Sequence, residues 1–434
     1  MSDPAFTEEF DATQAQPAVP AAPASLDEIN SLSNVRPVPR ITLQAFCETQ
    51  GVAKPIERLS EDRRMANAQT RVYMGGIPAA VEFYQTAPTP NLIVLESTQT
   101  GDSLMASLGQ LAEVCDPTSK VVVIGHQNDV HLYRDLVKSG ISEYLVAPVS
   151  IADLMGVISA LYVDPSAEPL GRSIAFVGAK GGVGSSTIAH NVGWSISTIF
   201  QNEVLVADMD LAFGTANINF DQDPPQSIAE AVFAPERVDE VYLDRLLAKC
   251  AERLSLLAAP SMLNRVYDFN ETAFQSIIAA AQRTAPTVVL DVPHSWNGWT
   301  RKTLATADEV VIVATPDLAS LRNTKNLIDT IESLRPNDFK PKLVLNMVDV
   351  PKRPEISVKD FTAPLNMMAS AVIQFDPHLF GTASNNGRML AESDPANPTV
   401  TTISELAHIV TGRGVVVEKP KTGLQSVLER LKKK

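Results

Sequence analysis

Short apolar runs alternate with amphipathic stretches along most of this chain. In the first part, five runs predict strands at Ile41–Phe46, Arg71–Met74, Leu92–Leu95, Val121–Gly125 and Glu143–Val146, of which the third and fourth are expected to be buried. The segments between and after them predict helices over Pro55–Ala68, near Pro78–Tyr84, and over Leu104–Val114, Val130–Ser139 and Ile151–Leu161. This alternation is typical of a doubly wound parallel sheet. Residues 40–163 are therefore predicted to form one α/β domain.

A second α/β unit is predicted over residues 171–413. Its apolar strands are expected at Ser173–Val177, Val204–Asp210, Thr287–Asp291 and Lys342–Asn346, and a helix is expected to begin near Ser186. The stretch 164–170 is polar and contains prolines, which indicates a linker. The first 39 residues are rich in Ala, Pro and acidic residues. Such a segment buries too little apolar surface to offset the cost of ordering, so it is predicted to be a disordered arm.

A basic tail is expected over residues 414–434, with a short amphipathic helix in it. Leu424, Val427, Leu428 and Leu431 follow the spacing of one helix face, and three lysines end the chain. Such a helix suits an anionic membrane surface, reached through residues 423–434, and binding would gain from two copies in a dimer. Packing against its own domain or a partner is the equally weighted alternative.

Composition narrows the function classes. The chain has 434 residues, which suits two or three domains, and its formal net charge of -14 argues against a general nucleic-acid binder. Its three cysteines are far apart, so neither a disulfide framework nor a zinc site is predicted. No apolar run is long enough for a transmembrane helix, and the N-terminus lacks the apolar core of a secretory signal. A cytoplasmic protein is expected.

The segment Gly178–Thr187 carries most of the chemical information. It reads GAKGGVGSST and lies between a predicted strand and a predicted helix, as a phosphate-binding loop does, but Ser185 stands where the usual lysine would be. Ser186 is expected to offer its hydroxyl to Mg²⁺ and Thr187 to contact the α-phosphate. The residues expected to bind the nucleotide here are Gly181, Gly182, Val183, Gly184, Ser185, Ser186 and Thr187.

Polar residues follow the other apolar strands at the edge where ligands bind in such sheets. Asp291 fits the role of holding a Mg²⁺-bound water, and Asp210 fits the role of orienting an attacking water. Asn346 can hydrogen-bond an adenine edge, although a turn or cap role is as compatible with its spacing. The predicted contacts that flank the base are Phe375, Asp376 and Pro377.

Together these motifs resemble the MinD/ParA family of deviant Walker-A ATPases over about residues 171–412. Lys180 matches the family's signature lysine. The resemblance implies that two chains sandwich two Mg²⁺-ATP molecules through the nucleotide face, with Lys180 and Asp210 as the catalytic pair. Because Ser185 replaces the lysine of the same chain, one positive charge near the phosphates is missing. At about 4 Å from a phosphate charge, and at an effective dielectric of about 20, such a charge is worth roughly 4 kcal/mol. Hydrolysis is therefore expected to be slow or absent, and ATP binding to be coupled to dimerisation.

The first domain resembles a response-regulator receiver domain, with the phosphorelay residues replaced. Glu96 ends the third strand where a receiver has its phosphoacceptor aspartate, and Ala147 precedes Pro148 where a receiver has a lysine. The acidic pair after the first strand is reduced to Glu48. A glutamate does not form the usual aspartyl phosphate, so the resemblance implies a pseudo-receiver that acts as a docking module. A response regulator that works by phosphorylation is disfavoured.

The order of the two domains resembles that of the CpaE/TadZ family, which localises the Flp (Tad) type pilus machinery. The segments GAKGGVGSSTIAH at 178–190, VPKRPEI at 350–356 and FDPHLFGTASNN at 375–386 carry this resemblance. It implies a cytoplasmic scaffold, peripheral at the inner membrane or cell pole. Its implied partners are a pilus secretion ATPase and inner-membrane platform proteins. A ParA-like partitioning or positioning ATPase for another cargo is the alternative. For His190 and His294, packing or solvent exposure is favoured over catalysis.

Overall fold

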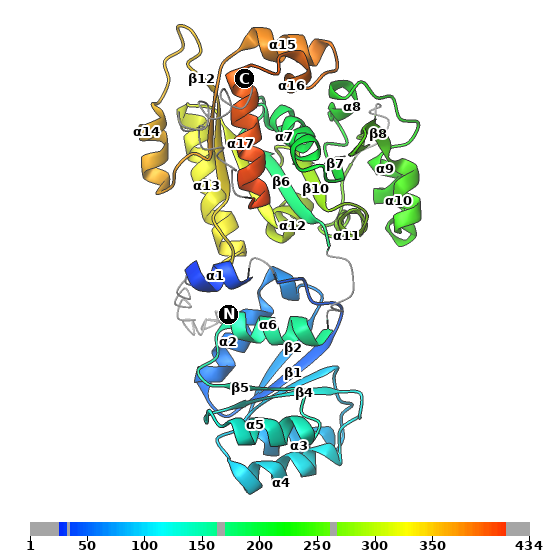
Figure 1. The fold of residues 1–434 in the computed structure, drawn as a ribbon, viewed down its shortest axis with the longest axis vertical. Helices are drawn as coiled ribbons and strands as arrows, with labels where there is room; N and C mark the ends of the chain where they lie inside the picture. Colours follow the sequence, from blue (N-terminus) through cyan, green and yellow to red (C-terminus); the bar gives the residue numbers. More distant parts are fainter. Residues whose placement is uncertain (1–25, 33–34, 163–169, 261–266, 414–434) are drawn as a thin grey trace, which may run out of the picture.

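The computed structural model describes residues 26–32, 35–162, 170–260 and 267–413, which form two α/β domains stacked end to end (Figure 1). We call residues 26–162 the first domain and residues 170–413 the second domain. The predicted arm up to residue 25, most of the predicted linker and the whole predicted tail, including its amphipathic helix, lie outside the described residues.

The first domain is a five-stranded parallel sheet in the order β2-β1-β3-β4-β5, which is the flavodoxin-like order. The predicted parallel α/β architecture is therefore confirmed here. Its strands are β1 (Thr42–Cys47), β2 (Gln69–Met74), β3 (Leu92–Glu96), β4 (Lys120–Gly125) and β5 (Glu143–Val146). Its helices are α1 (Leu26–Leu32), α2 (Gln50–Ser60), η1 (Arg63–Met65, a 3₁₀ turn), α3 (Gly76–Tyr84), α4 (Gly101–Ala112), α5 (Val130–Lys138) and α6 (Ile151–Tyr162).

Burial explains why these segments adopt this fold. Every residue of the central strand β3 is buried, as a strand covered on both faces requires. Apolar residues of α2 and α6 pack on one face of the sheet, and those of α3, α4 and α5 pack on the other. Each helix therefore buries one apolar stripe and leaves its polar side outward.

The structure corrects two predicted boundaries. The disordered arm is predicted to reach residue 39, but residues 26–32 form α1, and Leu32 and Val38 are buried in the first domain's core. The predicted helix Pro55–Ala68 instead runs as α2 from Gln50 to Ser60, and its continuation is the separate turn η1. Tertiary contacts set both boundaries, because they bury apolar groups of α1 and pair the charges of η1. Local sequence does not show these contacts.

The second domain is an eight-stranded sheet in the order β13-β12-β11-β6-β10-β7-β9-β8, parallel except for the edge strand β8. Its strands are β6 (Arg172–Gly178), β7 (Val204–Asp208), β8 (Ala248–Ala251), β9 (Leu254–Leu257), β10 (Thr287–Val292), β11 (Glu309–Ala314), β12 (Lys342–Val348) and β13 (Ala371–Gln374). Its helices are α7 (Ser185–Phe200), α8 (Ala216–Asn219), α9 (Ile228–Phe233), η2 (Pro235–Arg237), α10 (Glu240–Leu246), α11 (Gln275–Thr284), α12 (Gly298–Thr306), α13 (Leu318–Leu334), α14 (Val358–Thr362), η3 (Ala363–Leu365), α15 (Pro377–Asn385), α16 (Leu390–Ser393) and α17 (Pro398–Thr411).

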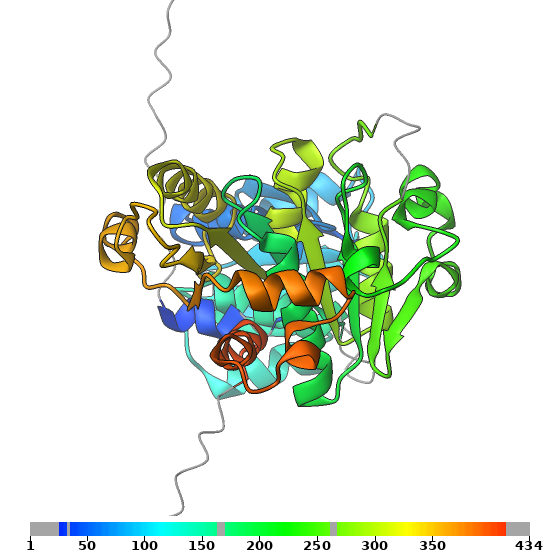
Figure 2. The same cartoon turned by 90° about the horizontal axis from the view of Figure 1, so that it is seen from above.

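Helices cover both faces of this sheet, as the view from above shows (Figure 2). Buried residues of α7 and α17 belong to the core on one face, and those of α11, α12 and α13 belong to the core on the other. The central strands β6, β10 and β11 carry apolar side chains on both faces. Their C-terminal ends meet at one edge, where the predicted functional residues also lie.

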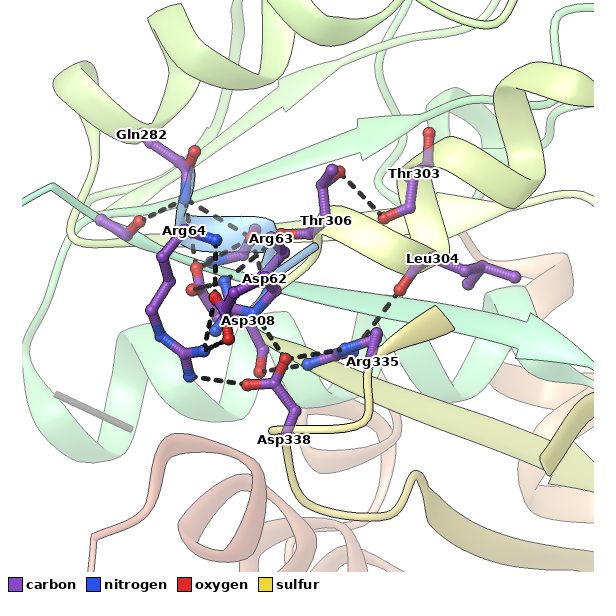
Figure 3. Close-up of polar contacts among 12 residues, drawn as sticks. Asp62, Arg63, Arg64, Gln282, Thr303, Leu304, Thr306, Asp308, Arg335 and Asp338 are labelled. Carbon is purple, nitrogen blue, oxygen red and sulfur yellow. Dashed lines mark hydrogen bonds and ion pairs between the residues drawn. The ribbon is translucent and has the colours of Figure 1, made fainter. Parts of the chain in front are cut away.

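The two domains meet through a buried cluster of charges, which we call the seam (Figure 3). Arg63 of η1 binds Asp308 at 2.8 Å and Asp338 at 2.9 Å, both in the second domain. Arg64 binds Asp338 at 2.7 Å and Asp62 at 3.0 Å, and Arg335 also contacts Asp338. The Arg63 side chain is 8% exposed and that of Arg64 is 1% exposed. The seam is therefore a buried ionic network rather than a surface contact.

The seam lies at the end of the second sheet opposite to the phosphate loop. Asp308 directly precedes β11, and Asp338 precedes β12, so both lie at the N-terminal ends of strands. Helix α13 spans the domain between the two ends: Asp317 caps its N-terminus near the loop, and Arg335 ends it at the seam. The first domain is thus attached without covering the candidate site.

Candidate functional site

The loop between β6 and α7 has the geometry of an anion cradle. Gly182 and Gly184 have positive φ angles of 79° and 84°, a conformation that glycine adopts without steric cost. A Cβ on Gly184 would come within 2.6 Å of the Asn346 amide nitrogen, so the close approach also requires glycine. Helix α7 begins at Ser185 with its free first-turn N–H groups at the end of this loop.

Neighbouring strands and helices hold the loop in place. Ala179 N–H donates to Val313 O of β11 at 2.8 Å, and Asn323 of α13 donates to Ala179 O at 2.9 Å. His294 bonds Gly178 O at 2.8 Å, and the Asn346 amide nitrogen donates to Val183 O at 2.8 Å. The cradle is therefore preformed, since elements from across the sheet bond three of its carbonyls and one of its N–H groups.

The loop and its surroundings fit a Mg²⁺-nucleotide. The Ser185 hydroxyl oxygen is buried and has no hydrogen-bond partner among the described residues, as expected of a polar group in a site for a charged ligand. Ser186 Oγ donates to Asp291 Oδ1 at 3.1 Å, which brings together the two predicted metal residues. A hydroxyl and a carboxylate are the oxygen donors that Mg²⁺ prefers, with water completing the shell. The described residues contain no group of three or more His, Cys, Asp or Glu placed to hold a metal.

A cavity of about 650 Å³ opens over the loop. Its walls come from the loop itself, from the segment after β7 that contains Asp210, and from the segment after β10 that contains His294. The Asp210 carboxylate faces this cavity and accepts the Phe213 N–H at 3.0 Å. The predicted role of Asp210 in orienting water requires a carboxylate at this cavity, and Lys180 of the loop lines the same cavity.

Asp208 is buried beneath the cavity and holds the loop after β7. Its two oxygens accept the N–H groups of Asp210 at 3.1 Å and Ala216 at 3.0 Å. Burial, with the nearby charge of Asp291, raises the pKa of Asp208 to about 7. Asp208 is thus a structural carboxylate, whereas Asp210 lines the cavity and Asp291 contacts Ser186, which also lines it.

A second cavity of about 280 Å³ adjoins the loop at Gly184. Its walls include Thr187, Asn346, Phe375, Asp376 and Pro377, so the structure gathers all the residues predicted near the base. Two of them also have structural roles: Asp376 accepts Leu379 N–H at 2.9 Å as the N-cap of α15, and Asn346 holds the loop. The apolar character of this cavity suits a flat heteroaromatic ring.

Lys180 is bound within its own chain. Its ammonium nitrogen lies 2.7 Å from Asp317 Oδ2, and both side chains are more than a third exposed. Although burial opposes ionisation of Asp317, hydrogen bonds from Lys180 and Thr315 lower the pKa of its carboxyl to about 2. The lysine therefore points to an acid at the rim of the site, and it must leave this partner to reach a phosphate on another chain.

Glu96 lies at the corner of the first domain where β1 and β3 end, which is where a receiver domain has its phosphorelay residues. This fully buried carboxylate accepts the N–H groups of Glu48 and Thr49, each at 2.7 Å, and the Thr49 hydroxyl at 2.7 Å, and it contacts His126. Burial opposes its ionisation, but the hydrogen bonds from Thr49 and Glu48 outweigh burial and lower the pKa of Glu96. The corner is thus occupied by an internal anion.

Comparison with known proteins shows which proteins the second domain is similar to. Residues 171–345 match the family model described as "AAA domain". The septum site-determining protein MinD of Synechocystis sp. is 24% identical over 255 residues, which is 57% of this chain and 91% of that protein. The chain contains a P-loop domain of the MinD/ParA ATPase family. The septum site-determining protein MinD from Pyrococcus horikoshii OT3, which has 17% identity and a TM-score of 0.47, is complexed with Mg-ADP in its solved structure.

Two solved structures extend the comparison. A ParA family ATPase from Chlorobium tepidum TLS has a TM-score of 0.50 and 24% identity, and the match covers 55% of this chain and 98% of that one. This likeness supports the fold of the MinD/ParA-type domain. The pilus assembly protein CpaE from Caulobacter crescentus CB15 shares 45% sequence identity over 98% of its solved chain and 30% of this one, with a TM-score of 0.29.

Sequence reasoning missed the contacts of three groups near the site. His190 is packed, as one of the two favoured readings has it, but its fully buried ring also contacts Asp291. Its position four residues after Ser186, on the helix that follows the loop, is a signal that could have found it. Asn323 and Asp317 carry no comparable local signal, since they act on the loop only through the packing of α13.

Proposed function

We propose that this MinD/ParA-type protein binds Mg²⁺-ATP and uses it to dimerise through the nucleotide face. The carrying observation is a preformed phosphate loop that has Ser185 at the lysine position and an exposed Lys180 at its rim. Backbone N–H groups, the N-terminus of α7, and Mg²⁺ held by Ser186 and Asp291 would bind the phosphates. Lys180 would supply the missing charge to the ATP of the partner chain.

Exposed apolar side chains around the site support a dimer on this face. Phe213 lines the larger cavity and is 73% exposed, Leu318 follows Asp317 and is 74% exposed, and Trp296 is 53% exposed. Large apolar groups gathered at the mouth of a polar site are typical of an interaction surface. Burying them against a second copy would enclose the nucleotides and compensate for the release of Lys180 from Asp317.

Hydrolysis by this protein is proposed to be slow or absent. Asp210 is placed to orient water, but no lysine of the same loop stands ready to stabilise charge on the transferred phosphate. The signature Lys180 is engaged by Asp317 in the single chain. Any turnover would therefore follow dimerisation, when Asp210 of one chain and Lys180 of the other chain face the same phosphate.

The cargo that we propose is the Flp/Tad type pilus secretion machinery. The 45% sequence identity with the C. crescentus pilus assembly protein supports this choice. The first domain would be a docking module rather than a switch, since Glu96 fills the phosphorelay corner with a fixed carboxylate. Its partners would be a pilus secretion ATPase and inner-membrane platform proteins at one site on the inner membrane or cell pole. No helix within the described ranges is long and apolar enough to cross a bilayer.

The experiment that tests this cargo is deletion of the gene in its host. Surface pili are counted by electron microscopy, and complementation uses the wild-type chain and an Asp291→Ala chain. We expect pili to be lost on deletion, restored by the wild type and not restored by the variant. Normal piliation in the deletion strain would contradict the proposal.

Septum positioning is the second candidate, because the MinD of Synechocystis sp. carries that name and matches over 91% of its length. The same deletion strain distinguishes the two functions. Displaced septa with normal pili would favour this candidate, whereas normal septa without pili would favour the first.

A further inference from the structure

A buried histidine stands directly behind the predicted metal residues. His190 lies one helical turn after Ser186 on α7, so the two side chains share one helix face. Ser186 Oγ donates to Asp291 Oδ1 at 3.1 Å, and His190 Nε2 lies 3.1 Å from Asp291 Oδ2. The two oxygens of one carboxylate are thus held by successive turns of the helix that follows the phosphate loop.

The second ring nitrogen of His190 fixes which nitrogen carries the proton. Asn219 of α8 places its amide nitrogen 3.0 Å from His190 Nδ1, and this nitrogen of Asn219 has only hydrogens to offer. Nδ1 must therefore accept, which leaves the proton of a neutral imidazole on Nε2, facing Asp291. Phe220 packs beside the His190 ring, with 5.4 Å between the two ring centroids, and helps to fix the plane of the imidazole.

Asp291 is a buried carboxylate that needs a partner for each of its oxygens. It lies in the buried end of β10, and its side chain is only 5% exposed. A buried polar group without a hydrogen-bond partner destabilises the fold, so both oxygens are expected to be bonded. Ser186 bonds one oxygen, and His190 contacts the other from the side away from the loop.

We propose that His190 is a positioning residue for Mg²⁺: with Asn219 behind it, it holds the Asp291 carboxylate in its orientation beside Ser186. This inference rests on the proposed binding of Mg²⁺-ATP. Groups that hydrogen-bond metal-binding carboxylates from behind orient them, and their loss typically weakens metal affinity about 10- to 100-fold. The contacts Asn219–His190–Asp291 also connect α8, in the segment after β7, with the end of β10.

The test measures binding of a fluorescent ATP analogue to the full chain over a series of Mg²⁺ concentrations and in EDTA. His190→Leu removes the donor while keeping an apolar side chain of similar size. His190→Gln retains an N–H donor near the position of Nε2. We expect the Mg²⁺ concentration at half-maximal binding to rise about 10- to 100-fold in His190→Leu. Binding in EDTA should stay unchanged, and His190→Gln should recover most of the Mg²⁺ response.

Asn219→Ala provides the same test without altering the buried ring, in case His190→Leu does not fold. It removes the group that selects the Nε2–H form, so a smaller rise in the Mg²⁺ requirement is expected. An unchanged Mg²⁺ requirement in the folded variants overturns the proposal. An equal loss with Mg²⁺ and in EDTA, not rescued by His190→Gln, also overturns it, because that is the signature of a purely structural residue. A wild-type chain that does not bind ATP would instead refute the proposed function.

Discussion

The seam between the domains offers a strong test of the structure through one side chain. Arg63 makes two ion pairs, with Asp308 and Asp338, and its side chain is 8% exposed. Arg63→Ala removes both pairs while leaving the two carboxylates in place. Breaking a buried pair by removing one partner costs about 3–5 kcal/mol, because the remaining charge stays buried.

The expected magnitude lies near the lower end of that range. Asp308 keeps hydrogen bonds from Ser173 and Gln282, and Asp338 keeps Arg64 and Arg335. We therefore expect a loss of about 3 kcal/mol in the free energy that couples the domains. With a denaturant dependence of about 1–3 kcal/mol per molar urea, the midpoint of the affected transition falls by about 1–3 M.

The three tryptophans make this loss measurable. Trp194, Trp296 and Trp299 all lie in the second domain, so their fluorescence follows that domain alone, whereas circular dichroism follows both domains. In the wild type, the two probes should give one coincident urea transition. In Arg63→Ala, the dichroism signal should begin to fall before the fluorescence, because the first domain no longer gains stability from the second.

Arg283→Ala is the matched control, since Arg283 pairs with Glu240 at the same 2.8 Å distance but with both side chains about half exposed. Its loss should cost less than about 1 kcal/mol and keep the transitions coincident. The reasoning is refuted if Arg63→Ala behaves like this control, with coincident transitions and a similar midpoint.

Three further predictions follow from charges at the seam and the loop. The pKa of Asp338 is lowered from 3.8 to about 2, with burial opposing the shift and Arg63 the largest cause favouring it. Its contribution to stability should therefore be present above about pH 4 and be lost as the pH falls toward about 2, as urea midpoints against pH will show. Asp317→Asn keeps the cap of α13 but frees Lys180. An exposed ion pair is worth about 0.2–1 kcal/mol, so its loss in both chains should strengthen ATP-dependent dimerisation about 2- to 30-fold. Sedimentation measures this gain, and a weaker dimer would contradict the prediction. Ser185→Lys should raise ATP affinity at least about tenfold when introduced into the Lys180→Ala chain, in a fluorescence titration, because it restores a charge within the same loop; unchanged affinity would show that Ser185 is not the missing contact.

Much of the fold could be predicted because buried parallel strands leave a local signature. The run Leu92–Leu95 has apolar residues only, and the structure buries all of β3. Strand β7, which ends at Asp208, and strand β10, in which Asp291 is the last residue but one, are also buried throughout. Their carboxylates could therefore be placed at one edge of the sheet from the order of the strands. The phosphate loop could be predicted from its glycines, since Gly182 and Gly184 adopt the positive φ angles that glycine allows.

The rest depended on contacts between residues far apart in the chain. Arg63 and Arg64 have the pattern of a helix surface, and only Asp308 and Asp338, about 245 and 275 residues later, make them a docking turn. The pairing of Lys180 with Asp317 was equally hidden, because it depends on how α13 packs beside the loop. Local sequence thus predicted the elements and the edge of the sheet that carries the site, but not the ionic contacts that connect them.

The measurement that tests the central claim most directly is ATP affinity and oligomeric state, followed in the same samples for the wild type and Lys180→Ala. A fluorescent ATP analogue and analytical ultracentrifugation with Mg²⁺ give both quantities. If Lys180 supplies the charge that Ser185 lacks, the wild type should dimerise on binding Mg²⁺-ATP, and the variant should lose affinity and dimerisation together. Normal dimers with normal ATP affinity in Lys180→Ala would contradict the account.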